Sequence, residues 1–202
     1  MTDRIIIGVT GASGVALGVS ALRLARAAGL ETHLVLTKAA ELTLGYETAL
    51  HPRDVRAMAD VDYAIGDVGA SIASGSFETR GMLIAPCSMK SLGEIAHGVG
   101  ATLLARAADV CLKERRRLVL MPRETPLHAG HLRAMLTVTE IGAVVMPPTP
   151  AWYAETQTLD EATDQLAARA LSLFGVAAPG LKRWGEELEK GRRRGGRGAD
   201  SD

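Results

Sequence analysis

Arg4-Ile-Ile-Ile-Gly-Val-Thr-Gly-Ala-Ser-Gly14 joins a short run of β-branched residues to a glycine-rich turn. The run is too short and too apolar for a lone surface element, so it predicts a buried strand over residues 4–9. The glycines allow a tight turn and a close approach of the backbone to a ligand. We expect the N–H groups of the next helix, with the hydroxyls of Thr10 and Ser13, to bind a phosphate. A plain strand-to-helix turn is the alternative interpretation.

Similar short aliphatic runs alternate along the chain with longer alanine- and leucine-rich runs of helical period. This alternation is typical of an α/β fold in which helices cover both faces of a parallel sheet. We expect strands over residues 4–9, 31–36, 81–85, 117–121 and 142–146, and helices over about 14–28, 38–50, 88–97, 101–115, 127–140 and 158–174. Residues 1–190 are predicted to form one domain, followed by a flexible tail over 191–202.

Composition narrows the classes of partner. Lys and Arg number 23 in the 202 residues, as do Asp and Glu, so the net charge is zero and nucleic acid is not an expected partner. Small molecules or copies of the same chain fit better. Cys87 and Cys111 lie in no metal-binding or disulfide pattern, no signal peptide precedes the first strand, and no apolar run reaches the roughly 20 residues of a membrane span. A cytoplasmic location without membrane contact is expected.

The predicted strand ends carry polar residues that converge on one crevice, because parallel strands end at the same edge of the sheet. Thr37, Ser88 and Arg123-Glu124 each follow a strand. Two hydroxyls, a guanidinium and a carboxylate suit a phosphorylated ligand and a proton transfer. Taken alone, Ser88 is interpreted as a helix N-cap, and Glu124 as a surface acid or a first-turn partner of a helix dipole.

Several other chemistries are disfavoured. The loop resembles that of short-chain reductases, but no acid follows the second strand and no Tyr stands four residues before a Lys. No Gly-Lys-Ser/Thr triplet of a Walker loop occurs, and the histidines lack metal-ligand spacing. The acidic stretch Asp160-Glu-Ala-Thr-Asp164 superficially resembles a magnesium-binding motif of terpene enzymes. Its position in the first turns of a helix capped by Thr158 is explained more simply by compensation of the helix dipole. Cys87 is interpreted as a buried small hydrophobe.

Five motifs together closely resemble the UbiX-type flavin prenyltransferases, from about residue 4 to Trp184. They are Gly11-Ala-Ser-Gly14, Pro86-Cys-Ser-Met-Lys90, Arg106-Ala-Ala-Asp-Val110, Leu112-Lys-Glu-Arg-Arg116 and Pro122-Arg-Glu-Thr-Pro126. The resemblance implies a Rossmann-like or flavodoxin-like flavoprotein, assembled as a dodecamer with FMN held between subunits. It also implies transfer of a dimethylallyl group from dimethylallyl monophosphate to N5 and C6 of reduced FMN, without a metal. The prenylated FMN would serve UbiD-type decarboxylases.

The resemblance also implies the site residues, position by position. FMN would be bound by Gly11, Ala12, Ser13, Thr37, Ser88, Met89, Lys90, Ser91 and Arg123. Tyr153 and Arg169 would hold the dimethylallyl phosphate. Catalytic positions would be Glu124, Lys113, Glu47, Arg106 and Trp184. For Arg106 and Lys113, a salt-bridge ladder on a solvated helix face is the alternative, since they flank Asp109 at helical spacing.

One departure from the family pattern stands out. Trp152-Tyr-Ala-Glu-Thr156 keeps the tyrosine of a family loop but lacks its neighbouring histidine and proline. Two other functions therefore stay open. The chain could be an FMN-binding accessory subunit of a hydroxyarylic acid decarboxylase that transfers no prenyl group. It could also be a flavin-dependent decarboxylase of cysteine peptides, although the early histidine and cysteine-bearing lid of that class are not evident.

Overall fold

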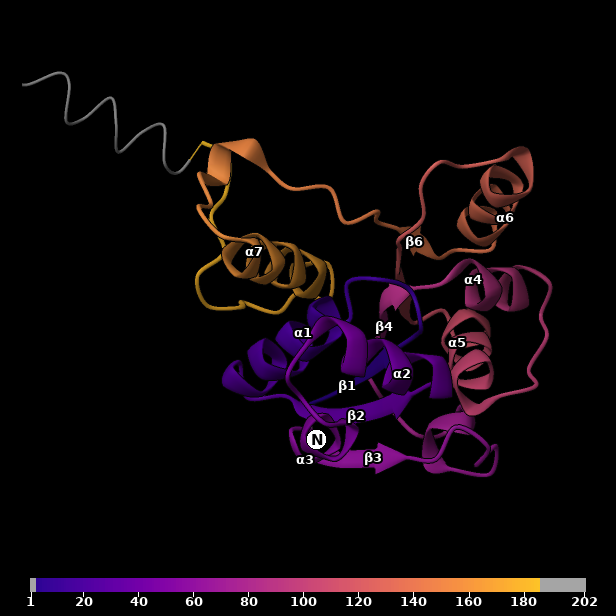
Figure 1. Cartoon of the computed structure of the whole chain (residues 1–202). Coiled ribbons are helices and arrows are strands. Elements are labelled where there is room, and N and C mark those ends of the chain that lie inside the picture. Colours follow the sequence, from indigo (N-terminus) through magenta and orange to yellow (C-terminus); the bar gives the residue numbers. More distant parts are fainter. Residues whose placement is uncertain (1–2, 186–202) are drawn as a thin grey trace, which may run out of the picture.

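The structure, a computed structural model, describes residues 3–185 of the chain. Its centre is a six-stranded sheet in which every neighbouring pair of strands is parallel. The strands are β1 (Arg4–Val9), β2 (Glu31–Leu36), β3 (Val61–Tyr63), β4 (Gly81–Cys87), β5 (Arg117–Pro122) and β6 (Val144–Val145). They lie in the order β3-β2-β1-β4-β5-β6 (Figure 1).

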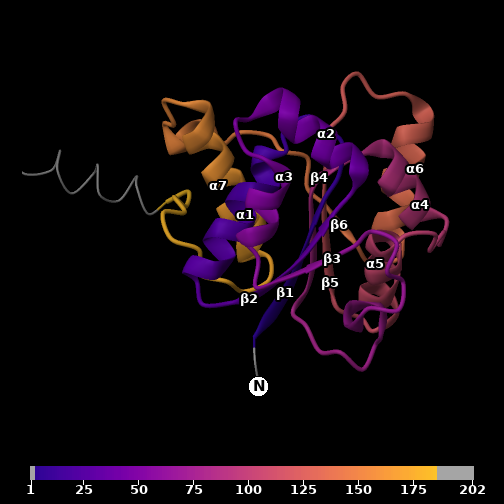
Figure 2. The same ribbon diagram turned by 60° about the horizontal axis from the view of Figure 1, so that its bottom comes forward.

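Helices cover both faces of this sheet, so the molecule has three layers (Figure 2). On one face lie α1 (Ala16–Ala27) and α7 (Leu159–Ser172), and on the other lie α4 (Met89–Ala96), α5 (Leu103–Lys113) and α6 (Ala129–Glu140). Two shorter helices, α2 (Lys38–Glu47) and α3 (Pro52–Ala57), connect β2 to β3. The predicted α/β fold with a helix-covered parallel sheet is thereby confirmed.

Each face of the sheet packs a separate apolar core, because successive strand side chains point to opposite faces. On β1, Ile5 and Ile7 join the core beneath α1 and α7, whereas Ile6 joins the core beneath α4 and α5. All three are at most 2% exposed. Burial on both faces explains why this strand is a continuous apolar run rather than an alternating pattern.

The strand order places a topological switch point between β1 and β4. From β1 the chain continues to β2 on one side, and it returns to β4 on the other side. Loops leaving the carboxyl ends of these two strands therefore diverge and leave a crevice between them, which is where open parallel sheets bind ligands.

The boundaries of β1 and β2 match the prediction residue for residue. The predicted end of the helix over 38–50 was wrong. The helix stops at Glu47, and a separate helix begins at Pro52, capped by the His51 side chain. The three-residue β3 was not predicted, and β6 pairs over two residues only. The tail predicted over 191–202 lies outside the described residues.

Among residues 3–185, no helix has both the length and the apolar character needed to cross a lipid bilayer.

Candidate functional site

A pocket of about 440 Å³ lies at the carboxyl ends of β1, β2 and β4. It is lined by three loops with small or polar residues: Gly11 after β1, Thr37 and Lys38 after β2, and Ser88, Lys90 and Ser91 after β4. Gly11 has no room for a side chain, since a Cβ there would lie 2.3 Å from the Ala39 Cβ. The first loop therefore packs directly against α2.

Two helices begin at the wall of this pocket, and each is capped by a hydroxyl. Thr37 Oγ1 accepts a hydrogen bond from the Ala40 amide at 3.1 Å, and Ser88 Oγ accepts one from the Ser91 amide at 3.3 Å. The prediction that Ser88 is an N-cap is confirmed. The amide groups and the positive dipole ends of α2 and α4 make this pocket suited to an anion such as a phosphate.

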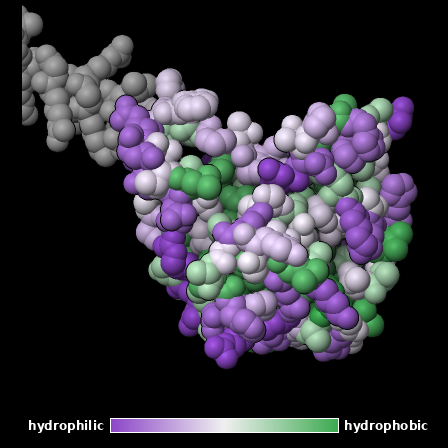
Figure 3. Space-filling model, in the orientation of Figure 1, coloured by the Kyte–Doolittle hydropathy of each residue, from purple (hydrophilic) through white to green (hydrophobic). Residues whose placement is uncertain are grey.

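A second hollow, of about 690 Å³, lies on the other side of the first loop. Its polar lining comes from the first loop, the end of α2, the loop after β5 and α7, and its remaining walls come from α1, α7 and the segment between β6 and α7. The polar residues are Ser13, Glu47, Thr48, Arg123, Asp160 and Thr163. The apolar residues lining it include Leu17, Pro148, Pro150, Leu159 and Leu166. Figure 3 shows the surface hollowed between the side of the molecule that carries α7 and the side that carries α6.

Glu47, the last residue of α2, reaches across to the start of α1. Its Oε2 accepts hydrogen bonds from the Gly14 amide at 2.8 Å and the Val15 amide at 3.1 Å. Burial alone would raise the pKa of this carboxyl, but hydrogen bonds from Ser13, Gly14 and Val15 and the charge of Arg123 hold the pKa below its ordinary value. Glu47 is therefore a carboxylate near neutral pH.

This contact corrects the predicted phosphate loop. The amides expected to bind a phosphate at the start of α1 are already bonded to a carboxylate, which would repel a second anion. The Thr10 hydroxyl is also directed elsewhere: Thr10 is 1% exposed, and its Oγ1 donates to the Pro86 carbonyl oxygen at 2.8 Å. A phosphate is better placed at α2 and α4, where the caps are neutral hydroxyls and the carboxylate of Glu94, which lines that pocket, is paired with Lys90 at 3.1 Å.

The strand-end loops bring together most of the residues expected to bind FMN. Gly11, Thr37, Ser88, Lys90 and Ser91 line the first pocket, and Ser13 and Arg123 line the second. Ala12 lies in the loop between the two. Met89 begins α4 and is half-buried against the core.

Glu124 follows Arg123 but lines neither pocket among the described residues. It is exposed, and its Oε1 accepts a hydrogen bond from the Thr125 amide at 3.0 Å.

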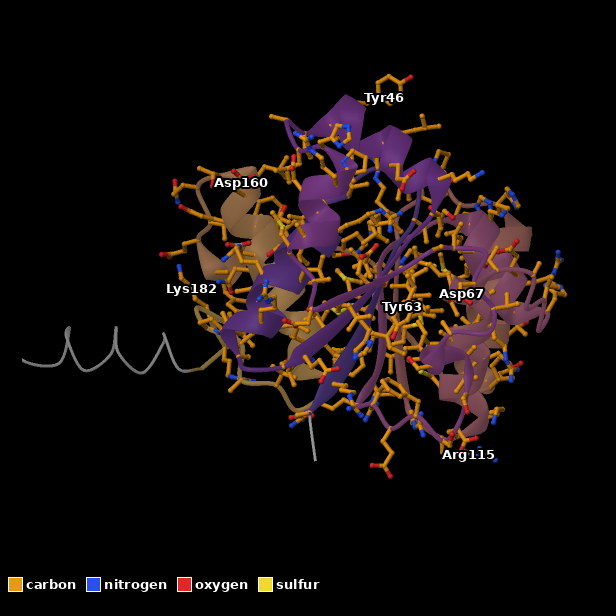
Figure 4. All side chains as sticks on the ribbon, turned by 90° about the horizontal axis from the view of Figure 1, so that it is seen from below. Tyr46, Tyr63, Asp67, Arg115, Asp160 and Lys182 are labelled. Atoms are coloured by element: carbon orange, nitrogen blue, oxygen red, sulfur yellow. The ribbon has the colours of Figure 1, made fainter. Side chains whose placement is uncertain are left out.

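Lys113 lies at the opposite end of the sheet from the crevice. It is the last residue of α5, and its ammonium pairs with Glu114 beside Gly75. The six residues of β5 follow, which at about 3.3 Å each carry the chain roughly 20 Å before Arg123 is reached. Figure 4 shows Arg115, which follows closely on α5, and Tyr46, at the end of α2, at opposite ends of the molecule.

Arg106 and Arg169 also lie outside the two pockets. Arg106 is on α5 and pairs with Asp109 at 2.7 Å, as the salt-bridge alternative predicted, but Lys113 does not complete that ladder. Arg169 is on the exposed side of α7, where its Nη1 donates to Ser172 Oγ at 2.8 Å.

Tyr153 and Trp184 contact each other on the α7 side of the molecule. Their rings meet edge to face with centroids 5.3 Å apart. Lys182 Nζ donates to the Ala154 carbonyl oxygen at 2.6 Å and ties the two segments together. Trp184 is 69% exposed and Tyr153 is 39% exposed, so this pair presents aromatic surface outward.

Cys87 is buried at the end of β4, and desolvation raises the pKa of its thiol to about 12. It is therefore no nucleophile at neutral pH, in line with the interpretation as a small hydrophobe. In the described part of the chain, no three His, Cys, Asp or Glu side chains come together as metal ligands would.

Sequence reasoning missed two features of the site. It did not find the apolar wall of the second hollow, because Pro148, Pro150 and Leu159 stand in loops or at a helix start, where apolar residues carry no periodic signal. It also assigned the Thr10 hydroxyl to a ligand rather than to the protein. A clue was available, since a threonine directly after a buried strand often bonds to neighbouring backbone.

Comparisons with known proteins place the chain among flavoproteins. The flavoprotein family model matches residues 1–169. Flavin prenyltransferase UbiX of Neisseria meningitidis is 55% identical over 184 residues, which are 91% of this chain and 97% of the relative. The crystal structure of AnUbiX in complex with FMN and dimethylallyl pyrophosphate superposes with a TM-score of 0.89, at 48% identity, and covers 91% of this chain and 98% of that one.

A second solved structure, the dodecameric FMN-dependent Ubix-like decarboxylase from Escherichia coli, has a TM-score of 0.86 at 46% identity. It covers 90% of this chain and 98% of its own. The matched regions extend over nearly the full lengths of both partners. The chain belongs to the flavoprotein family and, within it, to the UbiX flavin prenyltransferases.

Proposed function

We propose that this protein transfers a dimethylallyl group from dimethylallyl phosphate to N5 and C6 of reduced FMN. The observation that carries the proposal is the pair of pockets that meet at the Gly11–Ser13 loop, in a chain 55% identical to a flavin prenyltransferase. One pocket suits the phosphate of FMN. The other places Arg123, whose charge offsets that of Glu47, beside Ser13 and an apolar wall, which suits a phosphorylated prenyl donor.

Some residues of the crevice would bind the phosphate groups of FMN and of the donor, and others would shield the reacting prenyl group from water. Thr37 and Ser88 present helix N-termini to the phosphate of the flavin, with Lys90 beside them. Arg123 supplies fixed positive charge for the departing phosphate of the donor. Leu17, Leu166 and the Pro148–Pro150 segment line the hollow with apolar groups that shield a developing allylic cation from water. Reduced FMN, when bound, supplies the nucleophilic atoms that accept the prenyl group.

We further propose that one copy of the chain completes the site of another. Lys113 lies about 20 Å from the crevice of its own subunit and Arg169 is on the exposed side of α7, so each would act on a ligand that another copy holds. The Ubix-like decarboxylase from Escherichia coli is dodecameric, which supports such an assembly. We propose the dodecamer for this chain as well.

Exposed apolar side chains support that assembly. Leu42 and Tyr46 stand four residues apart on the outer side of α2, 67% and 88% exposed, and Tyr46 points away from the molecule in Figure 4. Leu132 and Leu136 stand likewise on α6, of which only Val138 is fully buried. Paired exposed apolar residues on two helices are more typical of an interface than of free surface.

Further proposals concern the donor, the product and the location. AnUbiX was crystallised with dimethylallyl pyrophosphate, whereas we propose the monophosphate as donor here. Prenylated FMN is proposed to serve a UbiD-type decarboxylase. Both described cysteines, Cys87 and Cys111, are free and buried, which supports a reducing cytoplasm.

The test is an anaerobic incubation of the purified protein with reduced FMN and dimethylallyl monophosphate, followed by mass analysis of the extracted flavin. We expect a flavin heavier by one five-carbon prenyl unit, and none in reactions without donor. FMN that binds tightly yet stays unmodified with either donor would contradict prenyl transfer and favour the accessory-subunit function.

A further inference from the structure

The three loops that form the crevice are tied to each other at the strand ends. The Thr37 amide donates to the Val9 carbonyl oxygen at 3.1 Å, which ties the loop after β2 to β1. The Arg123 amide donates to the Cys87 carbonyl oxygen at 3.2 Å, which ties the loop after β5 to β4. Both ties join backbone atoms, so they depend little on which side chains are present.

The tie between β1 and β4 is different, because it runs largely through one side chain. Regular pairing of these strands runs from Ile6 to Gly8 on β1, and Thr10 lies beyond it. Thr10 Oγ1 donates to the Pro86 carbonyl oxygen at 2.8 Å and accepts from the Ser88 amide at 2.7 Å. The Thr10 amide adds a longer bond of 3.3 Å to the same carbonyl oxygen.

The two segments joined by Thr10 are those that diverge at the switch point. Gly11 follows Thr10 directly, and Ser88 is the N-cap of α4. Both residues line the 440 Å³ pocket. One buried hydroxyl therefore joins the glycine-rich loop to the start of α4. Arg123 depends on it indirectly, through its bond to Cys87 between Pro86 and Ser88.

We propose that Thr10 is a positioning residue, whose hydroxyl sets the spacing between the Gly11–Ser13 loop and the Ser88–Ser91 start of α4. This inference rests on the proposed function, because it assigns the spacing to the binding of FMN for prenyl transfer. Groups that bind one rigid ligand from several loops must be held in place before it arrives, since a small displacement weakens every contact at once.

Replacing the hydroxyl by a methyl group tests the proposal at nearly constant volume. Thr10→Val removes the buried hydrogen bonds that the hydroxyl makes with the Pro86 carbonyl oxygen and the Ser88 amide. The two loops are then held together less firmly, because an unpaired buried polar group is unfavourable. We expect the dissociation constant for FMN, measured by flavin fluorescence, to rise about tenfold, and the circular dichroism of bound flavin to change. Thr10→Ser, which keeps the hydroxyl, should bind within about twofold of the parent.

Thr32 offers a matched control at the other end of the sheet. It is fully buried, and its Oγ1 also donates to an oxygen, Asp60 Oδ2 at 2.8 Å, and accepts from a backbone amide, that of Asp60 at 3.1 Å. Thr32→Val should lower the melting temperature as Thr10→Val does, but leave the affinity for FMN and the spectrum of bound flavin unchanged.

The outcomes separate the possibilities. An unchanged FMN affinity in Thr10→Val, or equal losses in Thr10→Val and Thr32→Val, would overturn the positioning role. If Thr10→Val does not fold, Thr10→Ser and Thr10→Ala are compared, because they differ only by the hydroxyl; equal affinities would again overturn it. The binding measurement does not require turnover. A parent protein that binds FMN but transfers no prenyl group would refute the proposed function. The role of Thr10 in FMN binding would still be decided by the affinities of the variants.

Discussion

At the scale of single residues, the site is organised by side chains that satisfy backbone groups. Thr37 and Ser88 cap the helices that begin at the crevice, and both were predicted to lie there from the residues alone. Each follows a buried strand and precedes a helix, so local chemistry is enough to find it. Glu47 is different. Its hydrogen bond to Gly14 spans 33 residues, and no local pattern indicates such a contact.

The charge of Glu47 is expected to stabilise the folded chain in a pH-dependent way. Its pKa is lower in the folded protein than the ordinary value of 4.5. The stabilisation is therefore present above about pH 4.5 and is lost as the pH falls through the lowered pKa of the folded state. Glu47→Gln should lower the free energy of unfolding by about 0.5–1 kcal/mol near neutral pH, because the charge faces the positive end of α1.

Urea denaturation of parent and variant at several pH values measures this difference. The free energies of unfolding of the two proteins should converge in acid, where the parent carboxyl is protonated and therefore neutral, like the glutamine amide. Glu140→Gln is the control, since that exposed side chain lies at the negative end of α6 and its loss should not destabilise the chain. A difference between parent and Glu47→Gln that stays constant down to the acid range would contradict the capping role.

At the scale of elements, the long strands and helices could be predicted and the short ones could not. β1 is a continuous apolar run because both faces of it are buried. In contrast, β3 pairs through Val61, Asp62 and Tyr63, of which none is fully buried. It is held by tertiary contacts instead: the Tyr63 hydroxyl lies 2.9 Å from His33 Nδ1 and 2.8 Å from Ser71 Oγ. Such contacts leave no periodic pattern in the sequence.

The packing of α1 on the sheet depends on Gly18. A Cβ at this position would lie 2.4 Å from the Ala85 carbonyl oxygen and 2.5 Å from Val9 Cγ2. Gly18→Ala must therefore push α1 away from the sheet. We expect a loss of about 1–3 kcal/mol in the free energy of unfolding, the usual cost of overpacking. Chemical denaturation, with circular dichroism as the signal, measures it.

Gly93 is the matched control, since it also lies within a helix but has nothing within 4 Å of its Cβ position. Gly93→Ala should be neutral or stabilise the protein by up to about 1 kcal/mol, because alanine favours the helix. Equal stabilities of the two variants would show that α1 does not depend on close contact at Gly18.

At the scale of the whole molecule, the residues that the sequence predicts for one site lie at separate places on the subunit. The crevice lies at one end of the sheet, while Lys113 lies at the other and Arg169 is on the exposed side of α7. Periodicity and motifs predict which residues matter and how each element folds. They do not predict which copy of the chain a residue serves, because an interface and a core have the same composition of small apolar residues.

A site shared between copies, which transfers a prenyl group to FMN, is tested most directly by co-expressing two variants. Lys113→Ala leaves the crevice intact, and Arg123→Ala leaves Lys113 intact. Each variant alone is expected to form prenylated FMN at a rate lowered by at least about tenfold. Mixed oligomers should regain measurable activity, because the crevice of one copy meets Lys113 of another. A double variant co-expressed with either single variant serves as the control. Mixed oligomers no more active than the single variants, beside an active parent, would contradict the shared site.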